Sequence, residues 1–128
     1  MDTLNQEKLI RQWFELWLEV DTADVRTIDN IFSSDIVYTE CYGPQYVGTE
    51  QLKRWFIEWN QQGRVLCWDI RRITGQNNVS AVEWFFRCEY QGTVSDFDGV
   101  TIACYDADGK ICRLSEFQSK SEHYCPFE

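Results

Sequence analysis

The chain has 128 residues and a mass of 15.2 kDa, a length that fits one domain with a single sizeable core. Hydrophobic residues make up 44% of the sequence and aromatic residues 16%, which is typical of a globular protein and excludes an intrinsically disordered one. The net charge is −9 and the pI is near 4.5, and no run of basic residues opposes that average, so we expect no nucleic-acid partner and no anionic membrane partner.

The N-terminal stretch MDTLNQEKLI is polar, and no apolar run is long enough to span a bilayer, so we expect a cytoplasmic location. An even number of cysteines would fit a disulfide framework, but no pair has CxxC spacing and most lie in strand-like apolar runs. Reduced core thiols are therefore the favoured interpretation. The sequence holds a single histidine, His123, without a close cysteine pair, so we expect no metal and no cofactor. The six cysteines are Cys41, Cys67, Cys88, Cys104, Cys112 and Cys125.

Apolar residues at helical spacing predict three helices in the first half of the chain. The first covers residues 4–20, and a shorter one covers about residues 24–32. The third begins at Thr49, a suitable N-cap residue, and ends at Gly63, a suitable C-terminal stop.

Alternating apolar and polar residues predict strands over residues 36–42 and 66–74, followed by three more between residues 78 and 117. Turn residues at 106–109, Asp-Ala-Asp-Gly, close the last hairpin. The order is helix, helix, strand, helix and four strands in antiparallel succession. It predicts an α+β fold with helices on one face of a bent sheet.

Four stretches, FSSD…TECYG…VGTE, AVEWFF, FDGVTI and DGKICRLSEF, resemble the nuclear transport factor 2-like superfamily, and its SnoaL-like and ketosteroid-isomerase-type members in particular. The resemblance covers nearly the whole chain, so we identify residues 1–128 as a single SnoaL-like domain. It implies a cone in which a strongly curved antiparallel sheet wraps around three N-terminal helices and leaves a central cavity. Members include isomerases, cyclases, dehydratases, epoxide hydrolases and non-enzymatic binding or dimerisation modules, so the fold alone does not choose a function.

The isomerase-type pattern places an acidic base five residues after the Asp that follows the second helix, ahead of a glycine. Glu40 matches that position in kind and spacing, between Asp35 and Gly43. The oxyanion-hole tyrosine and aspartic acid of the isomerases correspond to Leu16 and Thr101. Because leucine cannot donate a hydrogen bond, the resemblance argues against steroid isomerisation.

The same register assigns one set of alternating residues to the inner face of the sheet. On the fifth strand the set is small (Gly99, Thr101 and Ala103), which predicts open space beside it. On the neighbouring strands the inner set is Val82, Trp84, Phe86, Cys88 and Tyr90, then Leu114, Glu116 and Gln118.

Glu40 and Glu116 are the candidate catalytic residues. A carboxyl group walled by aromatic rings has its charged form disfavoured, and two such groups in one cavity can divide the acid and base roles. The alternative is that either glutamate lies at the rim, solvated or paired with Arg54 or Arg72.

Aromatic side chains are the candidate ligand-binding residues, because tryptophans at helical spacing form a cage for a flat or apolar molecule. The alternative is ordinary core packing. His123 is a candidate base if the tail folds over the mouth of the cone, and otherwise an exposed residue of a loosely held chain end. The predicted ligand-binding set is Trp17, Tyr38, Trp55, Trp59, Trp68, Trp84, Phe86, Thr101 and His123.

The sequence thus predicts a protein that binds a small apolar or aromatic organic molecule and performs cofactor-free isomerisation, dehydration or cyclisation. The alternative is a non-catalytic binding or dimerisation module. Apolar residues on the outer sheet face (Phe85, Val100, Ile102 and Cys104) predict a homodimer in either case.

Overall fold

The computed structural model describes residues 3–119 and 122–127. Both ends of the predicted domain (residues 1–2 and 128) and residues 120–121 of its tail lie outside the described residues. The described chain forms helices α1 (Thr3–Leu18), α2 (Ile28–Ile31) and α3 (Thr49–Gln62), with short 3₁₀ turns η1 (Val20–Thr22) and η2 (Val25–Thr27). The strands are β1 (Phe32–Thr39), β2 (Gln45–Val47), β3 (Gly63–Gln76), β4 (Val79–Tyr90), β5 (Thr93–Tyr105) and β6 (Ile111–Gln118).

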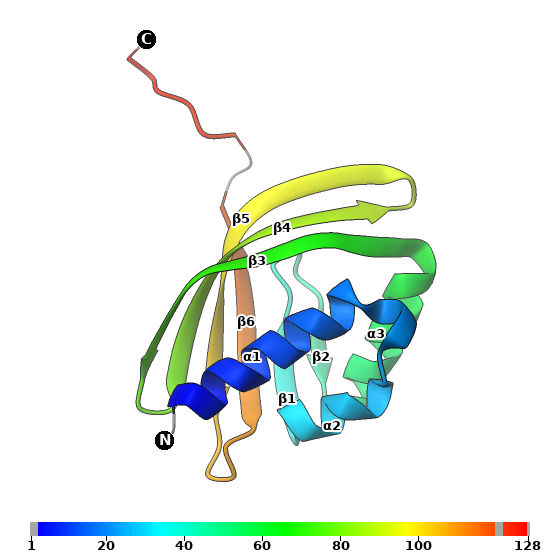
Figure 1. Ribbon diagram of the computed structural model, residues 1–128, viewed down its shortest axis with the longest axis vertical. Helices are drawn as coiled ribbons and strands as arrows, with labels where there is room; N and C mark the ends of the chain where they lie inside the picture. The colour runs from blue at the N-terminus through cyan, green and yellow to red at the C-terminus, as the bar shows by residue number, and fades with distance from the viewer. Residues whose placement is uncertain (1–2, 120–121, 128) are drawn as a thin grey trace.

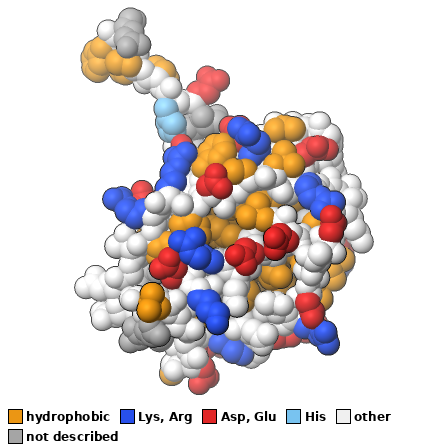
Figure 2. All heavy atoms as spheres, in the orientation of Figure 1, with side chains coloured by type: hydrophobic (Ala, Val, Ile, Leu, Met, Phe, Trp, Pro, Cys, Tyr) orange, Lys and Arg blue, Asp and Glu red, His pale blue; other side chains and the backbone are white. Residues whose placement is uncertain are grey.

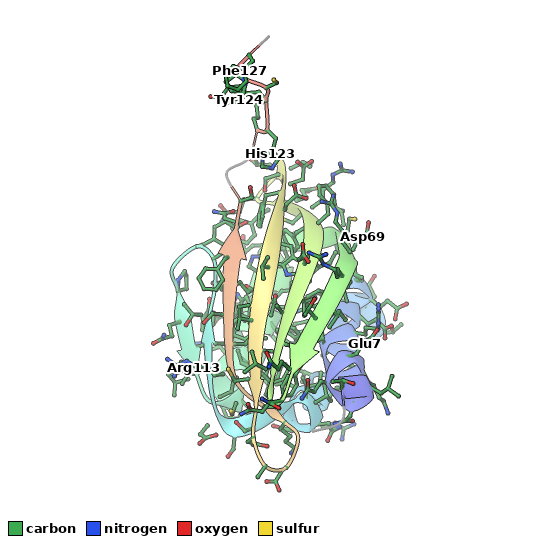
Figure 3. The ribbon with its side chains drawn as sticks, turned by 90° about the vertical axis from the view of Figure 1, so that its left-hand side faces the viewer. Glu7, Asp69, Arg113, His123, Tyr124 and Phe127 are labelled. Carbon is green, nitrogen blue, oxygen red and sulfur yellow. The ribbon has the colours of Figure 1, made fainter. Side chains whose placement is uncertain are left out.

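The six strands form one curved sheet in the order β2-β1-β6-β5-β4-β3, which wraps around the helices (Figure 1). Seen from its outer side, the sheet lies in front and the helices lie behind it (Figure 3). The predicted α+β fold, a curved sheet around three N-terminal helices, is confirmed. One strand pair departs from the predicted antiparallel arrangement: β1 and β6 run parallel, with Tyr38 opposite Leu114.

Helix α1 crosses the concave face of the sheet (Figure 1). Its buried residues recur every three or four positions, so one stripe of the helix faces the sheet and forms the centre of the core. Trp13, in the middle of that stripe, is fully buried and packs edge-on against Phe32 at 4.8 Å between ring centroids. The helix ends at Leu18, two residues before the predicted end.

The predicted second helix is shorter than expected. Residues 25–27 form a 3₁₀ turn and only Ile28–Ile31 are α-helical. Phe32 is already extended and pairs with Ile111, because its buried side chain fits the inner face of the sheet. The strand predicted from residue 36 therefore begins four residues earlier, and residues 33–35 belong to β1.

The segment before α3 also differs from the prediction. Residues 45–47 form the short edge strand β2 rather than a loop, and pair with residues 37–39. The N-cap is Gly48, not Thr49. Gly48 has a φ of +85°, a conformation that glycine adopts without strain, and no side chain caps the helix.

The last hairpin closes as predicted, with a turn at residues 106–109. Asp106 Oδ1 accepts hydrogen bonds from the backbone N–H of Asp108 at 2.9 Å and of Lys110 at 3.1 Å. Gly109 has a φ of +84°, so this turn requires a residue that tolerates the left-handed region.

On the face that carries α1, acidic and basic side chains are interspersed among apolar atoms (Figure 2). Within residues 3–119 and 122–127, no helix has the length and apolar character needed to cross a membrane.

Candidate active site

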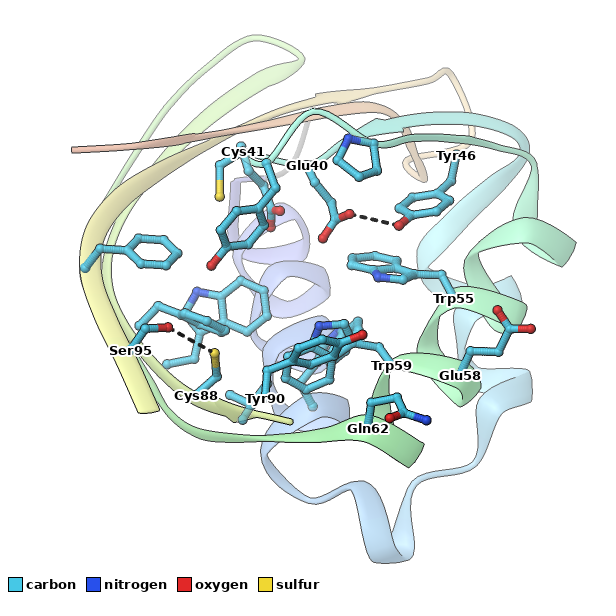
Figure 4. A pocket seen from close by; sticks show the side chains of 18 of the residues that line it. Glu40, Cys41, Tyr46, Trp55, Glu58, Trp59, Gln62, Cys88, Tyr90 and Ser95 are labelled. Carbon is cyan, nitrogen blue, oxygen red and sulfur yellow. Dashed lines mark hydrogen bonds between the residues drawn. The ribbon is translucent and has the colours of Figure 1, made fainter. Parts of the chain in front are cut away.

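A cavity of about 830 Å³ opens between α3, the segment around residues 40–46 and the curved halves of β3, β4 and β5 (Figure 4). Helix α1 contributes Trp17, and β6 contributes Glu116. Ten of its lining residues are aromatic: Trp17, Tyr42, Tyr46, Trp55, Trp59, Trp68, Trp84, Phe86, Tyr90 and Phe97. The cavity is therefore walled mainly by flat apolar surfaces, which is the common character of sites for small organic molecules.

The aromatic walls are held by contacts among themselves. Tyr46 stacks on Trp55, with ring centroids 4.6 Å apart and planes inclined by 15° (Figure 4). Trp59 lies 5.3 Å from Tyr90, so a residue of α3 meets a residue of β4 across the opening. Because each ring is packed against another, the shape of the cavity is set before any ligand enters.

Glu116 reaches the cavity from the inner face of β6. The surrounding protein excludes most water from its carboxyl group, and this burial raises the pKa of Glu116 to about 8. The hydrogen bond from Tyr38 lowers the pKa again in part, and the negative charge of Glu40 raises it. At neutral pH Glu116 is therefore mainly a neutral carboxylic acid.

A chain of two hydrogen bonds orients that acid. Trp13 Nε1 donates to Tyr38 Oη at 3.1 Å, and Tyr38 Oη donates to Glu116 Oε2 at 2.6 Å. An indole N–H can only donate, so the Tyr38 hydroxyl accepts from Trp13 and its own proton points to Glu116. Because Oε2 accepts that bond, Oε1 is the oxygen that carries the proton of the neutral acid. Burial also raises the pKa of Tyr38 well above its ordinary value, so Tyr38 remains a donor.

Glu40 lies just beyond the end of β1, in a turn where its backbone N–H donates to Pro44 O and its carbonyl oxygen accepts from Gly43. Its side chain points into the cavity, and Tyr46 Oη donates to Glu40 Oε2 at 2.8 Å (Figure 4). Burial raises the pKa of Glu40, and the Tyr46 hydrogen bond acts against that rise. The two carboxyl groups thus share one cavity in unequal surroundings.

The alternative ion pairs considered from the sequence do not form. Arg54 pairs with Glu58 at 3.1 Å, and Arg72 pairs with Glu83 on the outer sheet face. Neither arginine pairs with Glu40 or Glu116.

The structure brings most of the predicted ligand-binding residues to one cavity. Trp17, Trp55, Trp59, Trp68, Trp84 and Phe86 all line it. Tyr38 and Thr101 are fully buried and do not line it. Both instead contact residues that line the cavity. Tyr38 donates a hydrogen bond to Glu116, and the Thr101 hydroxyl accepts a 2.9 Å hydrogen bond from Trp84 Nε1.

The open space predicted beside the small residues of β5 is absent at Gly99. A Cβ atom there would collide with the ring of Trp84, so that side chain occupies the space. The large residue of one strand is accommodated by the missing side chain of the next.

His123 lies outside the cavity lining, at the base of the projecting tail (Figures 2 and 3). Its Nε2 atom is 3.4 Å from Asp98 Oδ2 and 3.4 Å from Ser119 Oγ. Both neighbours meet the same nitrogen, so the three do not form a Ser-His-Asp relay, which needs one partner on each ring nitrogen.

Several lining residues were not predicted. Tyr46 belongs to a three-residue strand too short to show an alternating pattern, and Cys41 faces the cavity because β1 ends at Thr39. Phe97 could have been predicted, because it lies an even number of residues from Thr101 on the same strand and so faces the same, inner side of the sheet.

Two thiols, Cys41 and Cys88, also line the cavity. Burial raises the pKa of Cys41 to about 12 and also raises that of Cys88, so both lining thiols stay protonated at neutral pH and are poor nucleophiles. Within the described ranges no three His, Cys, Asp or Glu side chains cluster as a metal site would require.

Three solved structures illustrate the likeness of the fold. A hypothetical protein with a ketosteroid isomerase-like fold from Catenulispora acidiphila, in complex with trimethylamine, is 16% identical, with a TM-score of 0.74 over 87% of this chain and 85% of that one. A putative polyketide cyclase from Xanthomonas campestris pv. campestris is 15% identical, with a TM-score of 0.72 over 91% of both chains. An LEH-like epoxide hydrolase from M. tuberculosis is 14% identical, with a TM-score of 0.77 over 91% of this chain and 84% of that one.

No curated protein matches the sequence. The sequence profile of the SnoaL-like domain, however, matches residues 10–114, which is most of the chain. The resemblance predicted from the sequence is thereby confirmed, and the chain belongs to the SnoaL-like domain family.

Proposed function

We propose that this protein binds a small, largely apolar organic molecule in the aromatic cavity and catalyses a cofactor-free proton transfer on it. Glu40 is the base, and Glu116 is the acid that donates through Oε1. The reaction class is isomerisation, dehydration or cyclisation, each of which moves a proton without a redox step.

The observation that carries this proposal is the pair of carboxyl groups in one aromatic cavity with unequal surroundings. Burial raises the pKa of both carboxyl groups, and Glu116, the more strongly buried of the two, holds its proton at neutral pH with a pKa of about 8. Two carboxyl groups that differ in burial within one cavity are suited to opposite roles, the one that keeps its proton as the acid and the more solvated one as the base. The relative in complex with trimethylamine supports a small organic occupant for this fold.

A nitrobenzisoxazole provides a test that does not need the natural substrate. A base removes its carbon-bound proton, the electron pair forms the nitrile, and the N–O bond breaks to give a coloured phenolate. We expect Glu40→Gln to lower the protein-catalysed rate about a hundredfold, because a positioned general base contributes on that order. Glu89→Gln, on the exposed outer side of β4, is the matched control and retains the rate. A Glu40→Gln variant as fast as the wild type, or a wild type no faster than buffer, would contradict the proposal.

A second candidate role is a homodimer built through the outer sheet face. Phe117 is 58% exposed on that face and lies opposite Val100 in the β5–β6 ladder, so the apolar row predicted from the sequence continues onto β6. Dimerisation is compatible with catalysis and with a purely binding role. A cytoplasmic location also remains a prediction.

A further inference from the structure

We propose that the ligand of the aromatic cavity is an organic cation, an ammonium group with apolar substituents. The inference rests on the proposed small-molecule function and names the charge of the molecule bound. It follows from which side chains line the cavity and which do not.

The charge of the lining is one-sided. Three of its residues are glutamates, Glu40, Glu58 and Glu116, and among the described residues that line the cavity there is no lysine, arginine or histidine. Glu58 is already paired with Arg54 at the rim, so the unpaired acidic groups are Glu40 and Glu116. An anionic ligand would meet these two groups with no compensating cation.

The walls supply the second attraction. Ring faces carry negative electrostatic potential and attract a cation that lies within about 6 Å of the ring centre. Trp55 stacks on Tyr46, and the Tyr46 hydroxyl in turn contacts Glu40, so an aromatic face and a carboxyl group adjoin in the same wall (Figure 4). An ammonium group beside Glu40 would therefore meet a charge and a ring face together.

Each of the two carboxyl groups also has one oxygen atom that no protein group within the described part of the chain occupies. Tyr38 occupies Oε2 of Glu116 and Tyr46 occupies Oε2 of Glu40, while the Oε1 atom of each carries no protein hydrogen bond within the described part of the chain. Glu40 Oε1 can therefore contact the cation directly, and Glu116 Oε1 can do so once the acid has released its proton. No arginine or lysine competes for these oxygens.

A cation in the cavity would also change the protonation of Glu116. The side chains that act on its pKa are Tyr38 and Glu40, and neither is basic. The Glu116 charge in turn acts on Cys41, Tyr42 and Tyr46, which are not basic either. The surrounding protein gives the acid a pKa of about 8, and a positive charge nearby would lower it. Binding near neutral pH therefore releases a proton, and affinity for the cation rises with pH.

The test compares choline with dimethylbutanol, the uncharged isostere in which carbon replaces the nitrogen of choline. Isothermal titration calorimetry is run in two buffers of different ionisation enthalpy, so that affinity and proton release are measured together. We expect choline to bind about tenfold more tightly or better, since a single desolvated cation–π contact is worth about that factor. We also expect choline, and not the isostere, to release up to one proton.

Two variants test which glutamate releases the proton and which one accounts for the preference for choline. Glu116→Gln should abolish proton release, and Glu40→Gln should remove most of the preference for choline, whereas Glu89→Gln on the outer face should alter neither. Equal or tighter binding of dimethylbutanol would overturn the inference and leave small-molecule binding in place. If neither probe binds while nitrobenzisoxazole is still turned over through Glu40, the cation inference alone fails. If neither probe binds and no turnover is seen, the proposed function fails with it.

Discussion

At the scale of single residues, Glu116 is a carboxyl group whose protonation at neutral pH the fold reverses. Burial raises its pKa to about 8, although Tyr38 donates a hydrogen bond to it. The Tyr38 hydroxyl also accepts a hydrogen bond from the buried Trp13 indole N–H, so the three side chains form one hydrogen-bonded chain. The consequence is a neutral carboxylic acid at a pH where a solvated glutamate is charged.

This shifted pKa predicts how stability depends on pH. Below the ordinary value of 4.5, Glu116 is protonated in both the folded and the unfolded chain. Between that value and about 8, the unfolded chain loses the proton and the folded chain keeps it, so this residue makes the free energy of unfolding fall as pH rises. The slope is at most about 1.4 kcal/mol per pH unit. Glu116→Gln removes this contribution, so urea denaturation should show the variant gaining stability relative to wild type as the pH rises from acidic to mildly alkaline.

The control for this comparison is a variant that loses an exposed carboxyl group instead of a buried one. Glu89→Gln makes the same chemical change at an exposed site, and its stability should follow the wild-type pH dependence. If the curves for Glu116→Gln and wild type run parallel, the carboxyl group is not held protonated by the fold, and its role as the acid is wrong.

At the scale of elements, the strands with a long alternating pattern were predictable and the short ones were not. Residues 79–90 alternate over twelve positions, and Val82, Trp84 and Cys88 are buried as that pattern predicts. Strand β2 has three residues, too few to show a period of two. The parallel pairing of β1 with β6 joins segments distant in the chain, and no local pattern encodes which direction they run.

The pairing of a large residue with a small one on adjacent strands was also beyond the sequence. Gly99 lies opposite Trp84 in the β4–β5 ladder, and the indole ring lies over it. The sequence predicts the strand and the face of each residue separately, but their contact depends on the register between the two strands. The two glutamates were identified as a pair because the resemblance supplied that register. Their hydrogen-bond partners Tyr38 and Tyr46 depend on side-chain packing that no spacing rule gives.

Gly99→Ala tests this contact. The added Cβ would strike the Trp84 ring and approach the Phe117 carbonyl oxygen to 2.5 Å, and backbone atoms yield little. We expect the free energy of unfolding to fall by about 1–3 kcal/mol, the usual cost of overpacking a core. The control is Gly75→Ala, where the nearest atom to a new Cβ is 3.6 Å away and the change should be small. Equal urea midpoints for the two variants would show that the sheet absorbs the extra atom at Gly99.

At the scale of the whole molecule, the outer sheet face is divided between charge and apolar surface. The guanidinium groups of Arg71 and Arg87 lie 5.6 and 5.5 Å from the ring centre of Phe85, so this ring is partly covered. Phe117 and Val100, nearer the other side of the sheet, are not covered in this way and form the apolar part of the face. A homodimer is therefore expected to centre on β5 and β6.

Analytical ultracentrifugation at micromolar concentration is expected to give a dimer that Phe117→Glu converts to monomer, because a carboxylate at the centre of an apolar contact loses its hydration without a partner. Ile57→Glu, which places the same charge at an exposed position of α3, should leave the dimer intact. Each copy carries a net charge of −9, so the two repel one another. Added salt screens this repulsion over a Debye length of about 10 Å and should strengthen the dimer. If the wild type stays monomeric at high salt, the predicted dimer is wrong. The outer face is then an ordinary solvated surface, and the cavity alone is the functional part of the fold.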